Sequence, residues 1–347
     1  PRSTPSNSSA ASDVYKRQQI RPGTDSALAL GMLNVIITEG LYDKEFTEAW
    51  TYGFDRLAEH VKQYTPEKMS EITWISADTI RDIARMYATN SPACITQGVA
   101  LDHCINGFQT NRAISCLIAI CGNFDVPGGN TFTTALNQKE LRLNDDISGE
   151  IGAAYPLFTR FLEESSSAPI TSAILTGKPY PIKALVINGS NAAITWPETS
   201  KVRKAFEKLD LFVVMDIFMN ETAEMADVFL PAATFLETTV LKDYAPTSIA
   251  AIVMAEQSIE PIGNAWPDWK FWVELARRMG YGELFPWNTD EELYTTLLEP
   301  SNFTVNQLKE KPVIFHHPKE ERRYLREGFH TPSGKAELYS DTIAQYG

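Results

Sequence analysis

Three short apolar runs between Ala184 and Glu237 each end at polar or turn-forming residues that can bind a small ligand. The runs cover residues 184–187, 211–215 and 228–230, and abrupt apolar runs of this length are typical of buried parallel strands. Between the first two runs, apolar side chains at helical spacing indicate a helix over residues 198–209. The segment therefore predicts a strand, a helix and a strand, followed by a third strand.

The polar residues of interest stand where these predicted strands end. In an open parallel sheet, ligands bind beyond the carboxyl ends of the strands. Those ends are Asn188 with Gly189, Ser190 and Asn191, then Asp216, then Pro231. Asp227 and Pro231 fit a structural role better than a chemical one, because they stand where the third strand begins and ends.

A second group of polar residues precedes a predicted helix near the start of the chain. Gly23, Thr24 and Asp25 form a turn before an apolar stretch that ends near Gly40, and Thr24 or Asp25 can cap that helix. A glycine turn before a helix presents free N–H groups, which suit an anion or the edge of a nucleobase. Most such turns are simple caps, so the signal is weak when taken alone.

Residues 93–130 suggest another sheet-based unit. The run from Ala93 to Val99 predicts a strand, and the loop after it carries Asp102, His103 and Asn106. Further helices are expected over residues 42–64, 77–88, 109–121 and 266–281, the last with Trp269, Trp272, Val273, Ala276 and Met279 buried. Val126-Pro127-Gly128-Gly129-Asn130 is a tight turn that cannot be helical.

Composition excludes several classes of protein. The 347 residues, 44% hydrophobic and 22% charged, are enough for two domains with full cores. Lys and Arg number 31 against 44 Asp and Glu, so the formal charge of -13 argues against a nucleic-acid or anionic-membrane surface. An anionic ligand must then be held locally, by N–H groups, helix N-termini and hydroxyls.

The cysteines and the N-terminus give little sign of chemistry. The four cysteines form no CxxC pair, so they are expected to be reduced core thiols. No apolar run is long enough to span a bilayer, and direct membrane insertion is not expected. Residues 1–18 are Ser-rich and lack an apolar core, and we expect them to be a non-native leader. Both a periplasmic and a cytoplasmic location stay open.

Five segments, taken in order, resemble a known family. They are RPGTDSALAL, GNFDVPGGN, INGSN, VVMDIFMNETAEMADVFLP with its trailing LE, and TPSGKAELYS. In order and spacing the chain resembles the catalytic subunits of molybdopterin-dependent oxidoreductases of the dimethyl sulfoxide reductase superfamily, over about residues 20–340. This resemblance implies a bis-(molybdopterin guanine dinucleotide) cofactor with Mo or W, and two Rossmann-like parallel-sheet units in an α/β fold.

The resemblance also implies roles for particular residues. Gly23, Thr24 and Asp25 would meet one guanine nucleotide. A second nucleotide or its pyrophosphate would be lined by Gly189, Ser190, Asn191, Met215 and Asp216. A glycine allows close backbone approach, and a carboxylate at a strand end can accept hydrogen bonds from a ribose diol or a guanine edge. Asp102 or His103 would approach the pterin. Asp268 matches an acidic position near a nucleotide, with a first-turn helix carboxylate as the equal alternative.

The sequence also departs from the family pattern. Neither the cysteine cluster for an iron-sulfur centre nor a segment with a molybdenum ligand is present, and the barrel that normally follows TPSGKAELYS is missing. The stretch TTVLKDYAPTS after Glu237 replaces an EG-containing segment. We therefore expect a fragment: a leader over 1–18, a first α/β unit over 19–135, a crossover over 136–180, a second α/β unit over 181–300, and a linker over 301–347.

The leading hypothesis is a molybdenum or tungsten enzyme that carries out two-electron redox or oxo transfer on a small substrate. No visible residue is assigned as a metal ligand or catalytic base. An iron-sulfur electron-transfer subunit is the expected partner. The alternative is a cofactor-less structural or electron-transfer subunit, which Gly23, Thr24, Asp25 and Asp216 argue against because an empty pocket does not need them. An NAD-dependent dehydrogenase is disfavoured, since no GxGxxG follows a predicted strand.

The remaining His and Trp residues suit structural roles. His60, His316, His317 and His330 have no partners at ligand spacing, so surface or structural roles are favoured over metal binding. The tryptophans at 266, 269 and 272 are expected to pack in a core rather than to stack on nucleic acid.

Overall fold

The computed structural model describes residues 18–131, 135–141, 151–158, 168–244, 250–315 and 321–346. These residues divide into two compact units, one formed by 18–131 with 321–345, the other by 135–315. The expected leader and His316 and His317 fall almost entirely outside the described residues, which include only Gln18 of the leader. No described helix is both long and apolar enough to cross a membrane.

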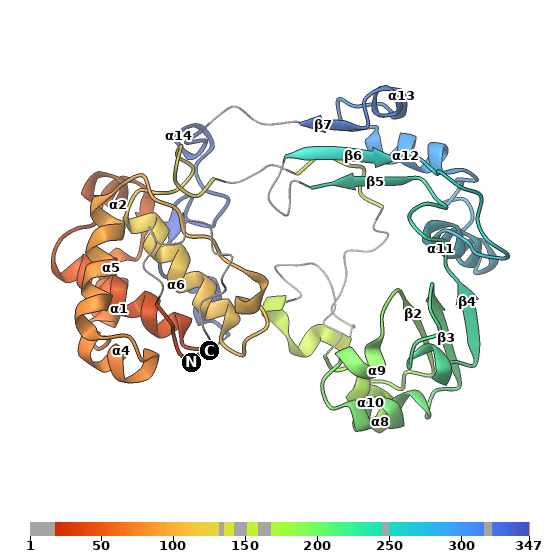
Figure 1. Ribbon diagram of the computed structural model, residues 1–347, viewed down its shortest axis with the longest axis horizontal. Helices are drawn as coiled ribbons and strands as arrows, with labels where there is room; N and C mark the ends of the chain where they lie inside the picture. The colour runs from red at the N-terminus through yellow and green to blue at the C-terminus, as the bar shows by residue number, and fades with distance from the viewer. Residues whose placement is uncertain are drawn as a thin grey trace, which may run out of the picture. The chain divides into compact units, whose positions relative to one another are not determined.

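The first unit is mainly helical (Figure 1), and its core is formed largely by α1 (Asp25–Thr38) and α6 (Gly107–Ile120). Its other elements are α2 (Lys44–Trp50), β1 (Thr51–Tyr52), α3 (Phe54–Val61), α4 (Pro66–Thr73), α5 (Ala77–Thr89), η2 (Val99–Leu101), α14 (Tyr324–Glu327), β8 (Ala336–Glu337) and α15 (Asp341–Ala344). Helix α1 is apolar on most sides and packs against α3, α4, α5 and α6. Its one buried amide, Asn34, donates to the Val61 carbonyl at 2.9 Å, so no polar group is left unpaired there.

The strand predicted over Ala93–Val99 is wrong: these residues are extended but belong to no strand, and Val99 begins η2. Asparagine side chains of the GNFDVPGGN turn take the place of a neighbouring strand. The Asn130 amide accepts from the Ile95 N–H at 3.0 Å and donates to the Ile95 carbonyl at 2.9 Å. The Asn123 side chain accepts from the Ala93 N–H at 3.0 Å. The side chains of the turn therefore form the backbone hydrogen bonds that a neighbouring strand would otherwise provide to the extended segment.

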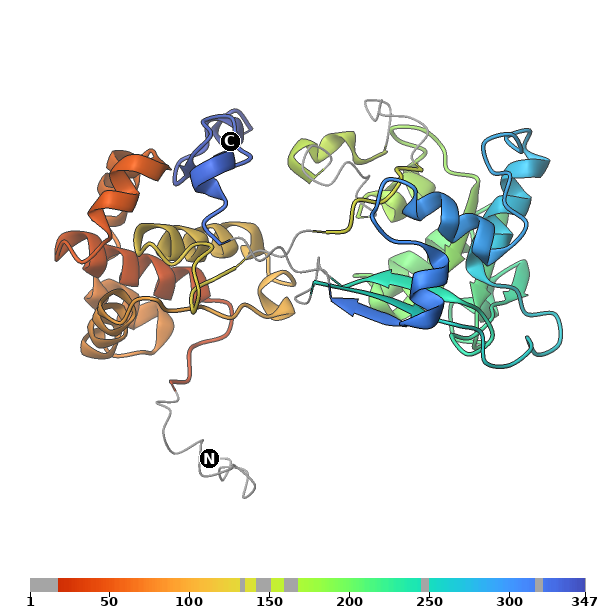
Figure 2. The ribbon, with the colours of Figure 1, turned by 90° about the horizontal axis from the view of Figure 1, so that it is seen from above.

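The C-terminal residues complete the first unit. Strand β8 pairs in parallel with β1, through Thr51 with Ala336 and Tyr52 with Glu337. The side chain of Leu338 joins the core around α1 and α6. Figure 2 shows this segment, in dark blue, beside the red and yellow helices of the same unit. The predicted single helix over 42–64 is therefore two helices, separated by β1.

A substitution at Gly53 can test how closely the C-terminal segment packs against the chain before α3. Its φ is +80°, and a Cβ there would lie 2.6 Å from the Cβ of Tyr339. Gly53→Ala should lower the free energy of unfolding by about 1–3 kcal/mol beyond backbone strain, because two packed atoms must separate. Gly40→Ala is the matched control, since Gly40 has φ +68° and nothing within 4 Å. Equal losses for the two variants in thermal unfolding would contradict the packing of Tyr339 on Gly53.

The second unit contains the predicted parallel sheet. Strands β2 (Ala184–Asn188), β3 (Leu211–Asp216) and β4 (Val228–Pro231) run parallel in the order β2-β3-β4. Helices α8 (Ile170–Thr176), α9 (Ala192–Thr195) and α10 (Thr199–Phe206) lie together beside this sheet (Figure 1). Val202 and Phe206 of α10 pack against Phe212 and Val214 of β3. The prediction of three parallel strands with a helix after the first is confirmed, as is the α/β fold class with parallel sheets.

Asp227 has the structural role that the sequence predicts. Its carboxylate accepts from the Phe212 N–H at 2.7 Å, and its own N–H donates to the Phe212 carbonyl at 2.9 Å. Asp227 therefore ties the beginning of β4 to β3.

An antiparallel sheet that the sequence did not indicate completes this unit. It consists of β5 (Val240–Asp243), β6 (Ala251–Ala255) and β7 (Val313–Phe315), in that order. The remaining elements are η3 (Ile151–Ala154), η4 (Ala223–Met225), α11 (Asp268–Arg278), α12 (Asp290–Leu298) and α13 (Val305–Glu310). Ile252 and Met254 of β6 share a core with Leu308 of α13. Of the expected linker, α13 and β7 thus pack in this unit, and residues 321–345 in the other.

Two details of the predicted side-chain burial are wrong. On α11, Val273 is buried, but Trp272 and Met279 are exposed, because the helix packs along a narrower face than its pattern suggests. Cys116 and Cys121 are buried thiols as expected, whereas Cys94 and Cys104 are exposed.

Candidate functional site

The parallel sheet brings the predicted ligand residues of the second unit to one edge. Asn188 of β2 is opposite Met215 of β3, so the residues after each strand lie side by side. The Gly189 N–H donates to the Met215 carbonyl at 2.9 Å. Gly189 has φ +60° and nothing within 4 Å of the position that a Cβ would take. The backbone at this point is therefore open to a ligand.

Asp216 organises the loop that follows β3. The residue is only 8% exposed. One carboxylate oxygen accepts from the Phe218 N–H at 3.0 Å, and the other accepts from Asn220 Nδ2 at 2.9 Å. A carboxylate has about four lone-pair directions, so Asp216 can accept further hydrogen bonds from a ligand.

Asn191 links the loop after β2 to the loop after β3. Its Oδ1 accepts from the Thr222 hydroxyl at 2.8 Å, and its Nδ2 donates to Glu221 at 2.7 Å. That second hydrogen bond lowers the pKa of the Glu221 carboxyl below its ordinary value. The Thr222 hydroxyl in turn accepts from the Ala193 N–H at 2.9 Å. The predicted residues Asn191 and Asp216 thus support one rigid edge. Ser190, between Gly189 and Asn191, is partly buried.

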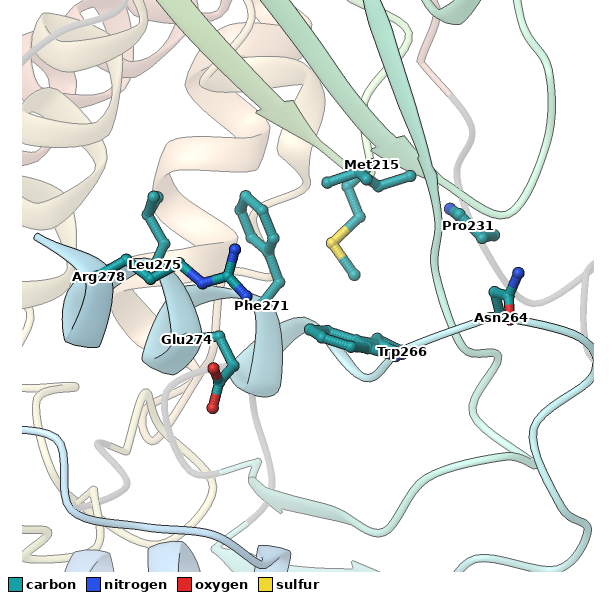
Figure 3. Close-up of a pocket in the computed structure, with 9 residues that line it drawn as sticks. Met215, Pro231, Asn264, Trp266, Phe271, Glu274, Leu275 and Arg278 are labelled. Atoms are coloured by element: carbon teal, nitrogen blue, oxygen red, sulfur yellow. The ribbon is translucent and has the colours of Figure 1, made fainter. Parts of the chain in front are cut away.

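A pocket of ≈ 450 Å³ opens beside this edge, on the side where α11 lies. Figure 3 shows the Met215 side chain directed into the space bounded by Phe271 and Trp266, with Phe271 and Arg278 both on α11. Trp266 is held next to the end of β4, since its N–H donates to the Pro231 carbonyl at 3.1 Å and its carbonyl accepts from the Ala233 N–H at 2.8 Å. The pocket offers flat aromatic walls, the cation of Arg278 and the carboxylate of Glu274, which pairs with Arg277 at 2.8 Å. The aromatic walls suit a planar ligand.

Sequence reasoning missed most of the lining of this pocket. Trp266 was expected in a core, but it is 40% exposed and lines the pocket. Phe271, Glu274 and Arg278 recur at helical spacing on α11, and that face of the helix was the available signal. Asp268, two residues after Trp266, is exposed in the first turn of α11. This position fits the first-turn alternative, and Asp268 does not line the pocket.

In the first unit, the structure places only some of the predicted cofactor-binding residues near one pocket. Asp25 lines a pocket of ≈ 340 Å³ with Gly98 and Leu101 at the end of the extended segment. The Thr24 hydroxyl donates to the Arg21 carbonyl at 2.7 Å rather than capping α1. Gly23 closes this turn with φ +79°. The turn before α1 therefore leaves N–H groups available near Asp25.

Asp102 and His103 do not line this pocket. Both are exposed, and the Asp102 carboxylate accepts from Asn111 Nδ2 at 3.0 Å. Asn111 Oδ1 accepts from Gln97 at 3.0 Å, so Asp102 joins a surface network on α6. In the described structure these two residues lie outside the pocket that contains Asp25.

The donor set decides which part of a cofactor these residues can hold. Within the described ranges, no group of three or more His, Cys, Asp or Glu side chains is arranged to bind a metal ion. The two pockets instead offer open backbone, carboxylates, amides and aromatic walls. These groups fit nucleotide and phosphate parts of an organic cofactor, and they do not fit direct metal coordination.

The second unit is thus a parallel α/β unit with an open sheet edge, and comparison with known proteins specifies the family. The family model described as molybdopterin oxidoreductase matches residues 4–278. The chain belongs to this family, within the dimethyl sulfoxide reductase superfamily.

Individual relatives agree with this assignment. The probable oxidoreductase YoaE of Bacillus subtilis is 34% identical over 354 residues, which cover 96% of this chain and 50% of YoaE. The thiosulfate reductase molybdopterin-containing subunit PhsA of Salmonella typhimurium is 29% identical over 94% of this chain and 48% of PhsA. The structure of acetylene hydratase from Pelobacter acetylenicus matches with a TM-score of 0.85 at 32% identity, over 94% of this chain and 49% of that one. The chain spans about half the length of the curated relatives it matches.

Glu237 holds the loop that carries the wall of the larger pocket. It is buried, and its carboxylate accepts from the Thr234 N–H at 2.8 Å and the Ile262 N–H at 2.6 Å. The chain that follows Ile262 carries Asn264 and Trp266, which both line the pocket. The Thr234 N–H, and then the Ile262 N–H, lower the pKa of the Glu237 carboxyl below its ordinary value of 4.5.

Glu237→Gln should lower the thermal unfolding midpoint at pH 7, because an amide cannot accept from both N–H groups equally well. Because the folded pKa is lowered, the stabilisation is present above pH 4.5 and is lost as the pH falls through the folded pKa. The difference between the wild type and Glu237→Gln should therefore shrink in acid. Exposed Glu260→Gln is the control. A difference that grows below pH 4.5 would refute the assigned role.

Proposed function

We propose that this chain binds the guanine nucleotide arms of a bis-(molybdopterin guanine dinucleotide) cofactor in a molybdenum or tungsten oxidoreductase. The observation that carries the proposal is the sheet edge at which open Gly189, carboxylate Asp216 and the aromatic pocket of Trp266 and Phe271 occur together. Family membership supports a molybdopterin cofactor with Mo or W, and the edge supports its guanine dinucleotide form.

Each group at the edge has a defined task in this proposal. Gly189 lets a pyrophosphate approach the backbone, because no side chain occupies that space. Asp216, already fixed by Phe218 and Asn220, accepts from the N1–H and amino group of guanine or from a ribose diol. Arg278 adds a positive charge at the pocket rim. These groups orient the nucleotide and do not take part in bond breaking.

The turn before α1 performs the same task for the other arm in the first unit. Asp25 accepts hydrogen bonds, and the free N–H groups of the first turn meet negative charge. When bound, the cofactor supplies two-electron redox or oxo-transfer chemistry on a small substrate. An electron-transfer partner is part of the proposal, since the relative PhsA is named as one subunit of thiosulfate reductase.

Hydration of a small unsaturated substrate is the second candidate, favoured by one observation. The structure with a TM-score of 0.85 to this chain is titled acetylene hydratase. A cofactor-less structural subunit is the third possibility, and the open, fixed edge around Asp216 argues against it.

The nucleotide edge can be tested directly with guanosine 5′-monophosphate and isothermal titration calorimetry on the full chain. Asp216→Asn should weaken binding by about tenfold or more, because a charged acceptor for the guanine edge is lost. Asp210→Asn is the matched control: it removes the same charge from an exposed residue just before β3, at the opposite end of the strand. Circular dichroism confirms that both variants are folded. Equal affinity in Asp216→Asn and the wild type would contradict the assignment.

The protein purified from its natural source provides the wider test. It should contain molybdenum or tungsten by plasma mass spectrometry, and it should release guanine nucleotide on acid treatment. Preparations with neither metal nor guanine nucleotide would favour the structural subunit. Metal without guanine would restrict the proposal to a molybdopterin lacking the dinucleotide.

A further inference from the structure

A separate pocket of ≈ 490 Å³ lies within the first unit, and it shares no lining residue with the pocket that contains Asp25. It is bounded by α1, α3, α6 and the segment after β8. On α1 it is lined by Ser26, Leu30 and Leu33, whereas the pocket with Asp25 is lined by Leu28, Ala29 and Met32. At 100° per residue these two sets lie on different faces of the helix, so the pockets are distinct.

Two guanidinium groups give this pocket a positive charge. Arg56 lies over the Tyr339 ring at 4.2 Å from its centroid, which fixes the side chain at the pocket wall. Arg112 is partly buried, and its Nη2 donates to the Leu338 carbonyl at 3.5 Å. Among the described residues, neither arginine forms an ion pair with an acidic side chain. No Asp or Glu lines the pocket.

This local charge has the opposite sign to that of the whole chain. Acidic residues exceed basic ones by 13, and other arginines of the same unit are paired with carboxylates, as Arg81 is with Glu67 and Arg85 with Glu39. Two arginines that line one pocket, without a carboxylate partner among the described residues, therefore create a local site for an anion.

The other lining residues indicate which chemical groups the ligand carries besides its anionic group. Asn106, Gln109, Ser26 and His60 supply neutral or titratable hydrogen-bonding groups near the arginines. Leu33, Leu57 and Leu338 are buried and form an apolar floor, with Tyr64 at the side. The ligand must combine an anionic head with an apolar or aromatic body, and the volume suits a small molecule.

The one thiol in the pocket does not add covalent chemistry. Cys116 is buried, and burial raises the pKa of its thiol to about 11. The thiol is therefore protonated at neutral pH and is a poor nucleophile. The pocket is suited to reversible binding.

We propose that this pocket binds a small phosphate monoester with an aromatic body, its phosphate held by Arg56 and Arg112 and its body resting on Leu33, Leu57 and Tyr64. A phosphate is favoured because two guanidinium forks match its several oxygens. This site is independent of the proposed cofactor function, because it shares no residue with the Asp25 pocket or with the Asp216 edge.

The test uses 1-naphthyl phosphate as the probe, titrated into the full chain and followed by its fluorescence. Binding should be saturable and should weaken as salt is added. Arg56→Gln and Arg112→Gln should each weaken it by about tenfold or more, since each removes a charge-assisted hydrogen bond to phosphate. 1-Naphthol, which has the same ring system without the phosphate, should bind at least about tenfold more weakly.

Arg85→Gln is the matched control, because it removes the same charge from an exposed arginine of the same unit that lies outside the pocket. It should bind the probe like the wild type, as should Asp216→Asn, which separates this test from that of the nucleotide edge. Arg56 is exposed, so its replacement is expected to leave the fold intact even if Arg112→Gln does not fold. Unchanged affinity in Arg56→Gln, equal binding of 1-naphthol, or no saturable binding would overturn the proposal.

Discussion

The position of β3 between β2 and β4 fixes every residue at the candidate nucleotide edge. The parallel register places Asn188 opposite Met215 and Asp216 opposite Pro231. A shift of one residue would turn Met215 from the pocket towards the helices and move Asp216 out of line with Gly189. The apolar contacts of Phe212 and Val214 with α10 make such a shift costly. The chemistry of the edge therefore depends on packing on the opposite face of the same strand.

Short polar side chains form many of the hydrogen bonds that hold the loops in both units. In the loops of the second unit, Asp216, Thr222 and Asn220 accept from backbone N–H groups, and Asn191 accepts from the Thr222 hydroxyl. In the first unit, Asn123 and Asn130 do the same for the extended segment near Ile95. Because most of these side chains bond to one or more backbone groups, these loops hold a defined shape without regular secondary structure.

Local pattern in the sequence was enough to predict the parallel sheet, since each strand of the β2-β3-β4 sheet is a short apolar run with a polar end. It also located Gly189, Asn191 and Asp216 at one edge. Features that depend on distant partners were not predictable. Residues 93–99 look like a strand, but their partners are the side chains of Asn123 and Asn130. The break at β1 depends on β8, near the far end of the sequence. Trp266 and Phe271 line a pocket only because α11 packs beside that sheet.

The pairing of β1 with β8 makes the first unit discontinuous in sequence, with the second unit inserted between its two parts. During synthesis, the second unit can acquire all its internal contacts before Leu338 and Tyr339 exist. The core around α1 is complete only when Leu338 has been added, because that side chain is supplied last. A second unit that folds earlier shortens the effective loop between β1 and β8 and reduces the entropy lost on closing it. The connectivity therefore allows the inserted unit to fold before the unit that surrounds it in sequence is complete.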